Sequence, residues 1–169
     1  DDVLIMAAIE RAGAQLVSCT ENIDESPQGK LLHGIMASMA EFYSQNLATE
    51  AKKGLHEKAK RGGTPGPAPV GYLNSTSRVE GVETKTVVVD DERAHHIVWA
   101  FQSYATGLWS LSELTEELER RGLKSRPTAR YVGSPLTRSQ VHRLLSNRYY
   151  LGKVTYGGAI YDGRHQALV

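Results

Sequence analysis

The sequence contains a single cysteine, Cys19, so neither a disulfide framework nor a cysteine zinc cluster can form within the chain. No stretch approaches the roughly 20 apolar residues that a membrane span needs. The first residues, DDVLIMAAIE, also lack the basic start of a signal peptide. These absences predict a soluble intracellular protein, in which Cys19 is a small apolar core residue.

Acidic side chains are almost missing from the last part of the chain. Residues 124–169 carry a net charge of +7 and residues 51–78 carry +5, whereas residues 79–123 carry −5 and residues 1–50 carry −6. Two basic segments separated by an acidic one are typical of a protein that turns two surfaces toward a phosphate backbone. Chance along an ordinary folded chain is the alternative.

Proline and turn clusters are absent between Pro27 and Gly62. Ser26 followed by Pro27 is a typical N-cap and first helical position, and Gly62-Gly63 with Pro65 is a typical helix end. The pattern predicts one helix over residues 27–61, roughly 50 Å long at about 1.5 Å per residue. A helix of that length cannot be covered by one small domain.

The two halves of this predicted helix differ in kind. The first half has an apolar stripe that is wider than one packing partner needs, so we predict that it forms a dimer interface rather than only a core helix. The second half is basic, and we predict contacts with DNA, with a solvated lysine face as the alternative. The predicted interface comprises Leu32, Ile35, Met36, Met39, Phe42 and Tyr43, and the predicted DNA contacts are Lys52, Lys53, Lys58, Lys60 and Arg61.

Before the long helix, helical spacing of apolar residues predicts a helix over residues 2–12, ended by Gly13. Residues 15–20 (QLVSCT) are predicted to form a strand. Helix, strand and long helix are the last part of an α/β unit, and a single strand cannot form a sheet. We therefore expect the chain to begin in the middle of a domain.

The loop and helix after this strand resemble the serine recombinases, particularly the large serine integrases. The resemblance is to the end of their resolvase-type catalytic domain, with a loop of the form E-x-x-D-x-S-x-x-G-K and a helix that carries A-E-F. Residues 52–74 (KKGLHEKAKRGGTPGPAPVGYLN) are similar to the junction between that helix and the recombinase domain. The matching residues are Glu21, Asp24, Ser26, Gly29 and Lys30 in the loop, and Ala40, Glu41 and Phe42 in the helix.

The resemblance implies an activity and its partners. A serine would attack a DNA phosphodiester, form a 5′-phosphoserine link, and allow strand exchange between dimers and religation, without a metal or nucleotide cofactor. The implied partners are attachment-site duplex DNA and further copies of the protein, a homodimer that becomes a tetramer in the synaptic complex. A cytoplasmic, nucleoid-associated protein of a bacterium, phage or mobile element is implied as well.

The resemblance also implies that the nucleophilic serine and most active-site arginines lie before Asp1. Residues 45–51 lack the arginine that many family members carry on the long helix. Ser38 and Ser44 are interpreted as ordinary helix serines, because neither has a base or an arginine cluster nearby in the sequence. We therefore expect no catalytic residue in this fragment, and DNA binding without cleavage.

Residues 62–71 (GGTPGPAPVG) predict an extended linker, because proline and glycine oppose regular structure. Next to Lys58, Lys60 and Arg61 it is expected to follow a minor groove, with Thr64 at the DNA, and a plain tether is the alternative. Strands are predicted over residues 70–73 and 84–89, joined by a polar loop over residues 74–83.

Three helices are predicted next. Asp90 or Asp91 caps the first, which ends at Gly107, and Ser110 and Glu113 form a capping box that opens an acidic second helix. The third opens with a capping box of Thr137 and Gln140. Its position after two helices, in a basic segment, favours a recognition helix in a major groove over a plain surface helix. Its predicted DNA contacts are Arg138, Ser139, Gln140, His142 and Arg143, with Lys124, Arg126 and Arg130 in the preceding loop and Arg148 after it.

The adjacent His95 and His96 are expected to point to different helix faces, so no metal site is predicted for them. Toward the end of the chain, Gly157-Gly158 between strand-like runs predicts a tight hairpin, which is a candidate wing beside the recognition helix. The tyrosines of this region are expected to pack as strand residues rather than to stack on bases. They are Tyr149, Tyr150, Tyr156 and Tyr161.

The sequence thus predicts a mixed α/β, mainly helical chain. Residues 1–25 are expected to end a catalytic domain, residues 26–61 to form the long helix, residues 62–71 the linker, and residues 72–169 a small α+β recombinase domain with β-hairpins and a helix-turn-helix-like trihelical core. The predicted function is that of a site-specific serine recombinase fragment. A winged-helix-like transcriptional regulator dimerised by the long helix is the alternative, and a protein-interaction module without DNA affinity is a third hypothesis.

Overall fold

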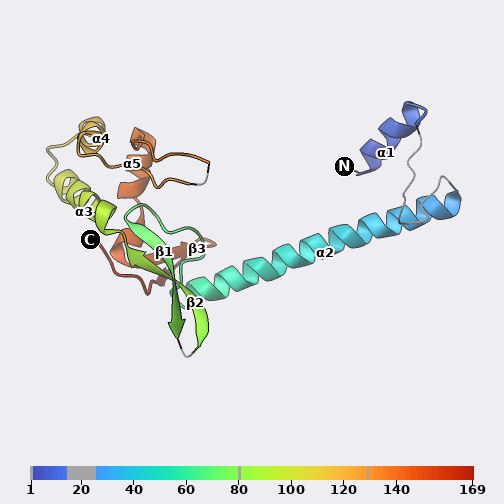
Figure 1. Ribbon diagram of the computed structural model, residues 1–169, viewed down its shortest axis with the longest axis horizontal. Helices are drawn as coiled ribbons and strands as arrows, with labels where there is room; N and C mark the ends of the chain where they lie inside the picture. Colours follow the sequence, from blue (N-terminus) through green and yellow to red (C-terminus); the bar gives the residue numbers. More distant parts are fainter. Residues whose placement is uncertain (1, 15–25, 80, 129) are drawn as a thin grey trace. The chain divides into compact units, whose positions relative to one another are not determined.

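The computed structural model describes residues 2–14, 26–79, 81–128 and 130–169 (Figure 1). The chain divides into two compact units, one up to Lys53 and one from Gly54 onward. It is a mixed α/β structure, as predicted, with α-helices and two β-hairpins. The predicted strand over residues 15–20 lies outside the described residues. None of the described helices is long and apolar enough to span a membrane.

The first unit contains α1 (Asp2–Arg11) and most of α2 (Pro27–Lys60). α2 is one uninterrupted helix of 34 residues (Figure 1). Its start is fixed by Ser26, whose Oγ accepts a hydrogen bond of 3.0 Å from the backbone N–H of Gly29. Gly62 ends it in the left-handed region, with φ of +76°. The long helix is therefore confirmed, one residue shorter than predicted.

The second unit contains the end of α2, followed by the antiparallel hairpin of β1 (Tyr72–Val79) and β2 (Val82–Val89). The register runs from Tyr72↔Val89 to Val79↔Val82. The predicted hairpin is confirmed, but the predicted polar loop over residues 74–83 is wrong, because most of it continues the two strands. Serine and threonine residues alternate here on a two-stranded ribbon that is largely open to solvent, so the sequence shows no apolar face to mark a strand.

The three predicted helices follow as α3 (Asp91–Ala105), α4 (Leu111–Arg120) and α5 (Arg138–Leu145). Both predicted capping boxes are present, Ser110 with Glu113 and Thr137 with Gln140. Asp90 caps α3 through its backbone only, because its carboxylate is buried in an ion pair with Arg93 at 3.0 Å. Six buried side chains of these helices share one core: Ile97, Ala100, Leu114, Leu118, Val141 and Leu144.

The chain then forms the 3-10 helix η1 (Arg148–Leu151) and the hairpin of β3 (Lys153–Tyr156) and β4 (Ala159–Asp162). Gly157 and Gly158 both have positive φ, as the predicted tight turn requires. Tyr149 and Tyr150 were expected in a strand, but they lie in η1, where the Asn147 side chain accepts from the backbone N–H of Tyr149. That local cap favours a helical turn over an extended strand at residues 148–151.

Tyrosines hold the centre of the second unit together. The rings of Tyr72 and Tyr150 stack 6.0 Å apart, and both are almost fully buried. Tyr72 donates its hydroxyl hydrogen to the carbonyl oxygen of Gln166 and Tyr150 donates to that of Val70, each over 2.8 Å. Burial and the nearby Tyr149 raise the pKa of Tyr72 to about 12. The core therefore joins the first and last parts of this unit.

Candidate nucleic-acid interface

A groove runs between the end of α2, the linker over residues 62–71 and the β1–β2 hairpin. Four cationic side chains line it: Lys58, Arg61, Lys85 and Arg164. Among its described lining residues, Glu57 is the one carboxylate, and it accepts a hydrogen bond of 3.0 Å from Lys60. That bond holds the pKa of Glu57 below its usual value. The groove is therefore cationic, with its acid already paired.

Hydroxyl and amide side chains of the hairpin complete the wall of the groove. Lys85 lies between Thr84 and Thr86 on β2 and opposite Thr76 on β1, so this wall offers short hydrogen-bonding groups around one charge. Such groups, together with Arg and Lys, make most protein contacts to nucleic-acid phosphates. The wall comprises Asn74, Ser75, Thr76, Ser77, Thr84 and Thr86.

The linker is part of the second unit and is held by contacts with other residues of that unit. Thr64 Oγ1 lies 2.5 Å from the hydroxyl of Tyr149. A Cβ atom at Gly62 would lie 2.6 Å from the carbonyl oxygen of Asp162, so only glycine allows this close approach. The linker has no regular structure, as predicted, but its carbonyl groups and small side chains form part of a fixed surface.

Arg126, a predicted DNA contact, is hydrogen-bonded within the second unit. Its guanidinium donates to the carbonyl oxygen of Ala68 over 3.2 Å and also to that of Tyr72. The side chain is partly buried and fixes the linker to the start of β1. This is a structural role that the sequence analysis did not predict, and the expected DNA contact of Arg126 stays a prediction. This contact could not be predicted from the sequence, because Arg126 and Tyr72 are 54 residues apart.

The outer face of α5 presents the predicted recognition residues together. Arg138, Ser139, His142 and Arg143 are exposed and line a shallow hollow with Leu111. Within the part of the chain that the structure describes, Arg143 makes one long hydrogen bond, 3.4 Å from its Nε to the carbonyl oxygen of Ser139. This side chain therefore stays available to a partner.

Gln140 belongs to the cap of α5. Its Oε1 accepts from the backbone N–H of Thr137 over 2.7 Å, so the oxygen that an adenine contact would use is engaged. Gln140 is exposed like its neighbours, but its geometry favours the capping role over the predicted base contact.

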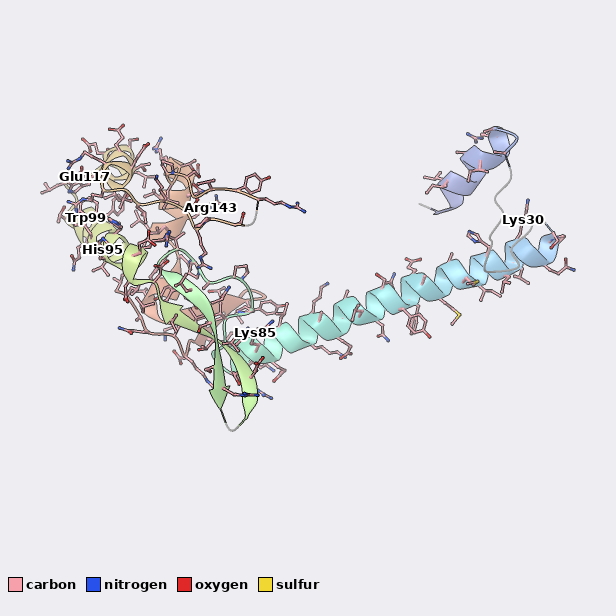
Figure 2. The ribbon with its side chains drawn as sticks, in the orientation of Figure 1. Lys30, Lys85, His95, Trp99, Glu117 and Arg143 are labelled. Carbon is pink, nitrogen blue, oxygen red and sulfur yellow. The ribbon has the colours of Figure 1, made fainter. Side chains whose placement is uncertain are left out.

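α3 and α4 carry a different surface. Glu117 accepts from Arg120 and Arg121, which holds its pKa low, and the Arg121 guanidinium lies 3.8 Å from the ring centroid of Trp99. His95, Trp99 and Glu117 lie here, apart from Arg143 on α5 and Lys85 on β2 (Figure 2).

The rings of His95 and His96 are 3.9 Å apart, so the expectation that they point to different faces is wrong. Burial, followed by the charges of His95 and Arg121, lowers the pKa of His96. No cluster of three or more possible metal ligands occurs in the described part of the chain.

The remaining predicted DNA contacts are exposed but scattered. Lys53 pairs with Glu50 at 2.7 Å, and Lys52 lies beside it on α2. Lys124, Arg130 and Arg148 are exposed in the second unit. Sequence reasoning missed two cations of the groove, Lys85 and Arg164. Lys85 alternates with threonines in a pattern typical of a strand, which could have pointed to it. No pattern in the sequence marked Arg164.

The predicted dimer interface on α2 is largely open in the first unit. Exposed fractions reach 62% for Phe42 and 63% for Tyr43, and Met36 is half-buried. Ile35, Met39 and Phe42 line a shallow apolar hollow. Leu32 is also exposed. The dimer itself stays a prediction.

Comparisons with known proteins address the family. Residues 1–64 match the family model "Resolvase, N terminal domain", and residues 91–169 match the model "Recombinase". No protein in the comparison with curated sequences matches. The resolvase match is not a feature of a winged-helix transcriptional regulator, so that alternative is not favoured.

Two solved structures are similar in fold. One is described as a crystal structure of an LSR–DNA complex, with 16% identity, a TM-score of 0.49, and coverage of 69% of this chain and 33% of that one. The other concerns the sequence requirements of the Listeria innocua prophage attP site, with 16% identity, a TM-score of 0.46, and coverage of 68% and 43%. The chain thus spans less than half the length of either. Because the resolvase and recombinase models match in tandem over all but residues 65–90, the chain belongs to the large serine recombinase family.

Proposed function

We propose that the protein is a site-specific serine recombinase and that this chain binds the attachment-site DNA. The observation that carries the proposal is the cationic groove of Lys58, Arg61, Lys85 and Arg164, whose one described carboxylate is already paired. Cationic side chains that replace the counterions of DNA phosphates supply much of the affinity of DNA-binding proteins. The groove is therefore assigned to the phosphate backbone.

Recognition of the DNA base sequence is assigned to α5. Arg138, His142 and Arg143 lie on one exposed face of a short helix that is anchored from behind by Val141 and Leu144. A helix of this kind fits the major groove, where arginine binds guanine O6 and N7. The capping box fixes where α5 begins, so it also fixes which side chains face outward.

The chemistry of the whole protein is proposed from its family. A serine would attack the phosphodiester and hold the cut strand as a 5′-phosphoserine, which keeps the ester energy for religation. Among the described serines, Ser38 donates its hydroxyl hydrogen to the carbonyl oxygen of Gly34 within α2, as an ordinary helix serine does. The exposed apolar residues of α2 are proposed to join two protomers.

The test measures binding of the chain to a pool of random-sequence duplex DNA at several salt concentrations. We expect affinity to fall steeply with salt, and Lys85→Ala and Arg164→Ala each to reduce the slope of log affinity against log salt by about one. Arg120→Ala on α4 is the matched control and should leave the slope unchanged. A wild-type affinity that does not respond to salt would refute the assignment of the groove to phosphates.

Selection from the same pool tests site specificity. Repeated rounds of binding and amplification should enrich one sequence motif if α5 reads bases. Selection that enriches no motif would reduce the chain to a nonspecific DNA-binding protein.

A further inference from the structure

The loop over residues 124–136 precedes α5 and has a closed, hydrogen-bonded base. Its base is closed by a bridge between Lys124 and Pro135 and by a 2.8 Å hydrogen bond from the N–H of Ser125 to the carbonyl oxygen of Ser134. Gly133 allows this closure, because a Cβ atom there would lie 2.4 Å from the carbonyl oxygen of Ser125. In Figure 1 the loop, in orange, extends from the unit beside α5.

The described residues near the tip are also held in place. The N–H of Thr128 donates to the carbonyl oxygen of Tyr131 over 2.8 Å, and the N–H of Tyr131 donates to Oγ1 of Thr128 over 3.1 Å. These two bonds tie the backbone of Tyr131 to Thr128. The loop therefore presents its outer side chains from a defined backbone.

Those outer side chains are apolar and unusually open to solvent. Tyr131 is 74% exposed, and Val132, at 90%, is the most exposed large hydrophobic residue in the described part of the chain. Arg130, directly before them, is exposed as well. An arginine beside an aromatic and a β-branched residue combines a charge for phosphates with an apolar wedge.

The charge of the surrounding chain indicates which partner this tip meets. Residues 124–161 contain no aspartate or glutamate, and they hold Lys124, Arg130, Arg138 and Arg143. A surface of one sign is complementary to a polyanion and opposes a second copy of itself. The loop runs into Thr137, the N-cap of α5, so it is tied to the start of the proposed recognition helix.

We propose that Arg130, Tyr131 and Val132 enter the minor groove next to the major groove that α5 occupies. Proteins place arginine in narrow minor grooves and insert apolar side chains against base steps there, and segments that flank a recognition helix commonly reach this neighbouring groove. Arg130 would contribute charge, and Tyr131 with Val132 apolar contact. The inference rests on the proposed binding of duplex DNA by α5.

The first experiment separates the two contributions. With the motif selected from the random pool, Tyr131→Ala with Val132→Ala should weaken binding about 10-fold without changing the salt slope, because no charge is lost. Arg130→Ala should lower the slope by about one. Tyr104→Ala is the matched control, an exposed tyrosine on α3, and should bind like wild type. Since the replaced side chains are exposed, thermal unfolding should show all variants folded.

The second experiment locates the contact by hydroxyl-radical footprinting, which reports on sugars at the minor groove. Wild type should protect a patch beside the segment covered by α5, and the double variant should lose that patch. Unchanged affinity of the double variant, or weaker binding with the patch still protected, would overturn the inference. A wild-type chain that binds no duplex would instead overturn the proposed function.

Discussion

α4 and α5 are built alike on the inside and differ on the outside. Each is short, opens with a complete capping box and buries two aliphatic side chains in the same core, Leu114 and Leu118 for α4 and Val141 and Leu144 for α5. Their length and caps therefore do not distinguish them.

The outer faces carry opposite charge. α4 contains four glutamates, of which Glu117 is largely covered and paired with Arg120 and Arg121, whereas α5 contains arginines and a histidine and no acidic residue. The inner faces of the two helices determine how they fold, and the outer faces determine that only α5 suits a polyanion. The predictions below test this separation.

The largest effect is expected from the inner faces. Leu118→Ala and Leu144→Ala should each lower the free energy of unfolding by about 2–5 kcal/mol, because each leaves a cavity in a shared core. Glu116→Ala, on the exposed side of α4, is the control and should change it by less than about 0.5 kcal/mol. Urea unfolding measures all three, and a loss confined to one helix would show that their inner faces are not equivalent.

The next effect concerns the outer faces. Arg143→Ala should weaken binding to the selected motif by about 1–3 kcal/mol and relax base preference, because a bidentate contact to guanine is lost. Arg120→Ala on α4 should not affect binding. Fluorescence anisotropy with the motif and with a scrambled duplex measures both. Equal weakening on the two duplexes would make Arg143 a phosphate contact instead.

The two caps should be worth similar amounts. Ser110→Ala and Thr137→Ala should each cost about 1 kcal/mol of stability, because each leaves a backbone N–H of the first turn without its acceptor. Thr137→Ser keeps the hydroxyl and should restore most of the loss. Thermal unfolding measures these changes. A cap that costs nothing on removal would mean that packing alone sets the start of that helix.

The smallest effect is a pH dependence on the α3–α4 side. The pKa of His96 is held below its usual 6.5, first by burial and then by the charges of His95 and Arg121. The unfolded chain therefore takes up a proton at a higher pH than the folded one, so this stabilisation is complete above about pH 6.5 and decreases as the pH falls below it. His96→Gln should flatten the acid side of a plot of Tm against pH relative to wild type, and an unchanged plot would refute this contribution of His96.

Local signals in the sequence predicted most of the fold. Ser26, Gly62 and the two capping boxes mark helix ends with hydrogen bonds between near neighbours, so a short segment is enough to find them. The Gly157-Gly158 turn belongs to the same class. The full length of the β1–β2 hairpin was not predicted, because its solvent-facing strands lack the alternation of apolar residues that marks a strand.

Contacts between distant residues could not be predicted in this way. Thr64 and Tyr149 are 85 residues apart, and the donor role of Arg126 depends on carbonyl groups that the backbone path brings to it. A basic residue in a basic loop predicts a DNA contact, whereas its acceptors within the protein cannot be identified from the sequence. The groove was missed as a unit for the same reason, since Lys58, Lys85 and Arg164 come from three separate segments.

The hydrogen bonds of the linker make the segment over residues 62–71 rigid relative to β1 and η1. With Thr64 bonded to Tyr149 and Arg126 bridging Ala68 and Tyr72, a rotation applied at Gly62 has to turn β1 and η1 as well. Inserting a flexible residue between Gly66 and Pro67 would therefore do more than lengthen the linker. It would displace Thr64 relative to Ala68, so that both anchoring hydrogen bonds could not keep their present geometry.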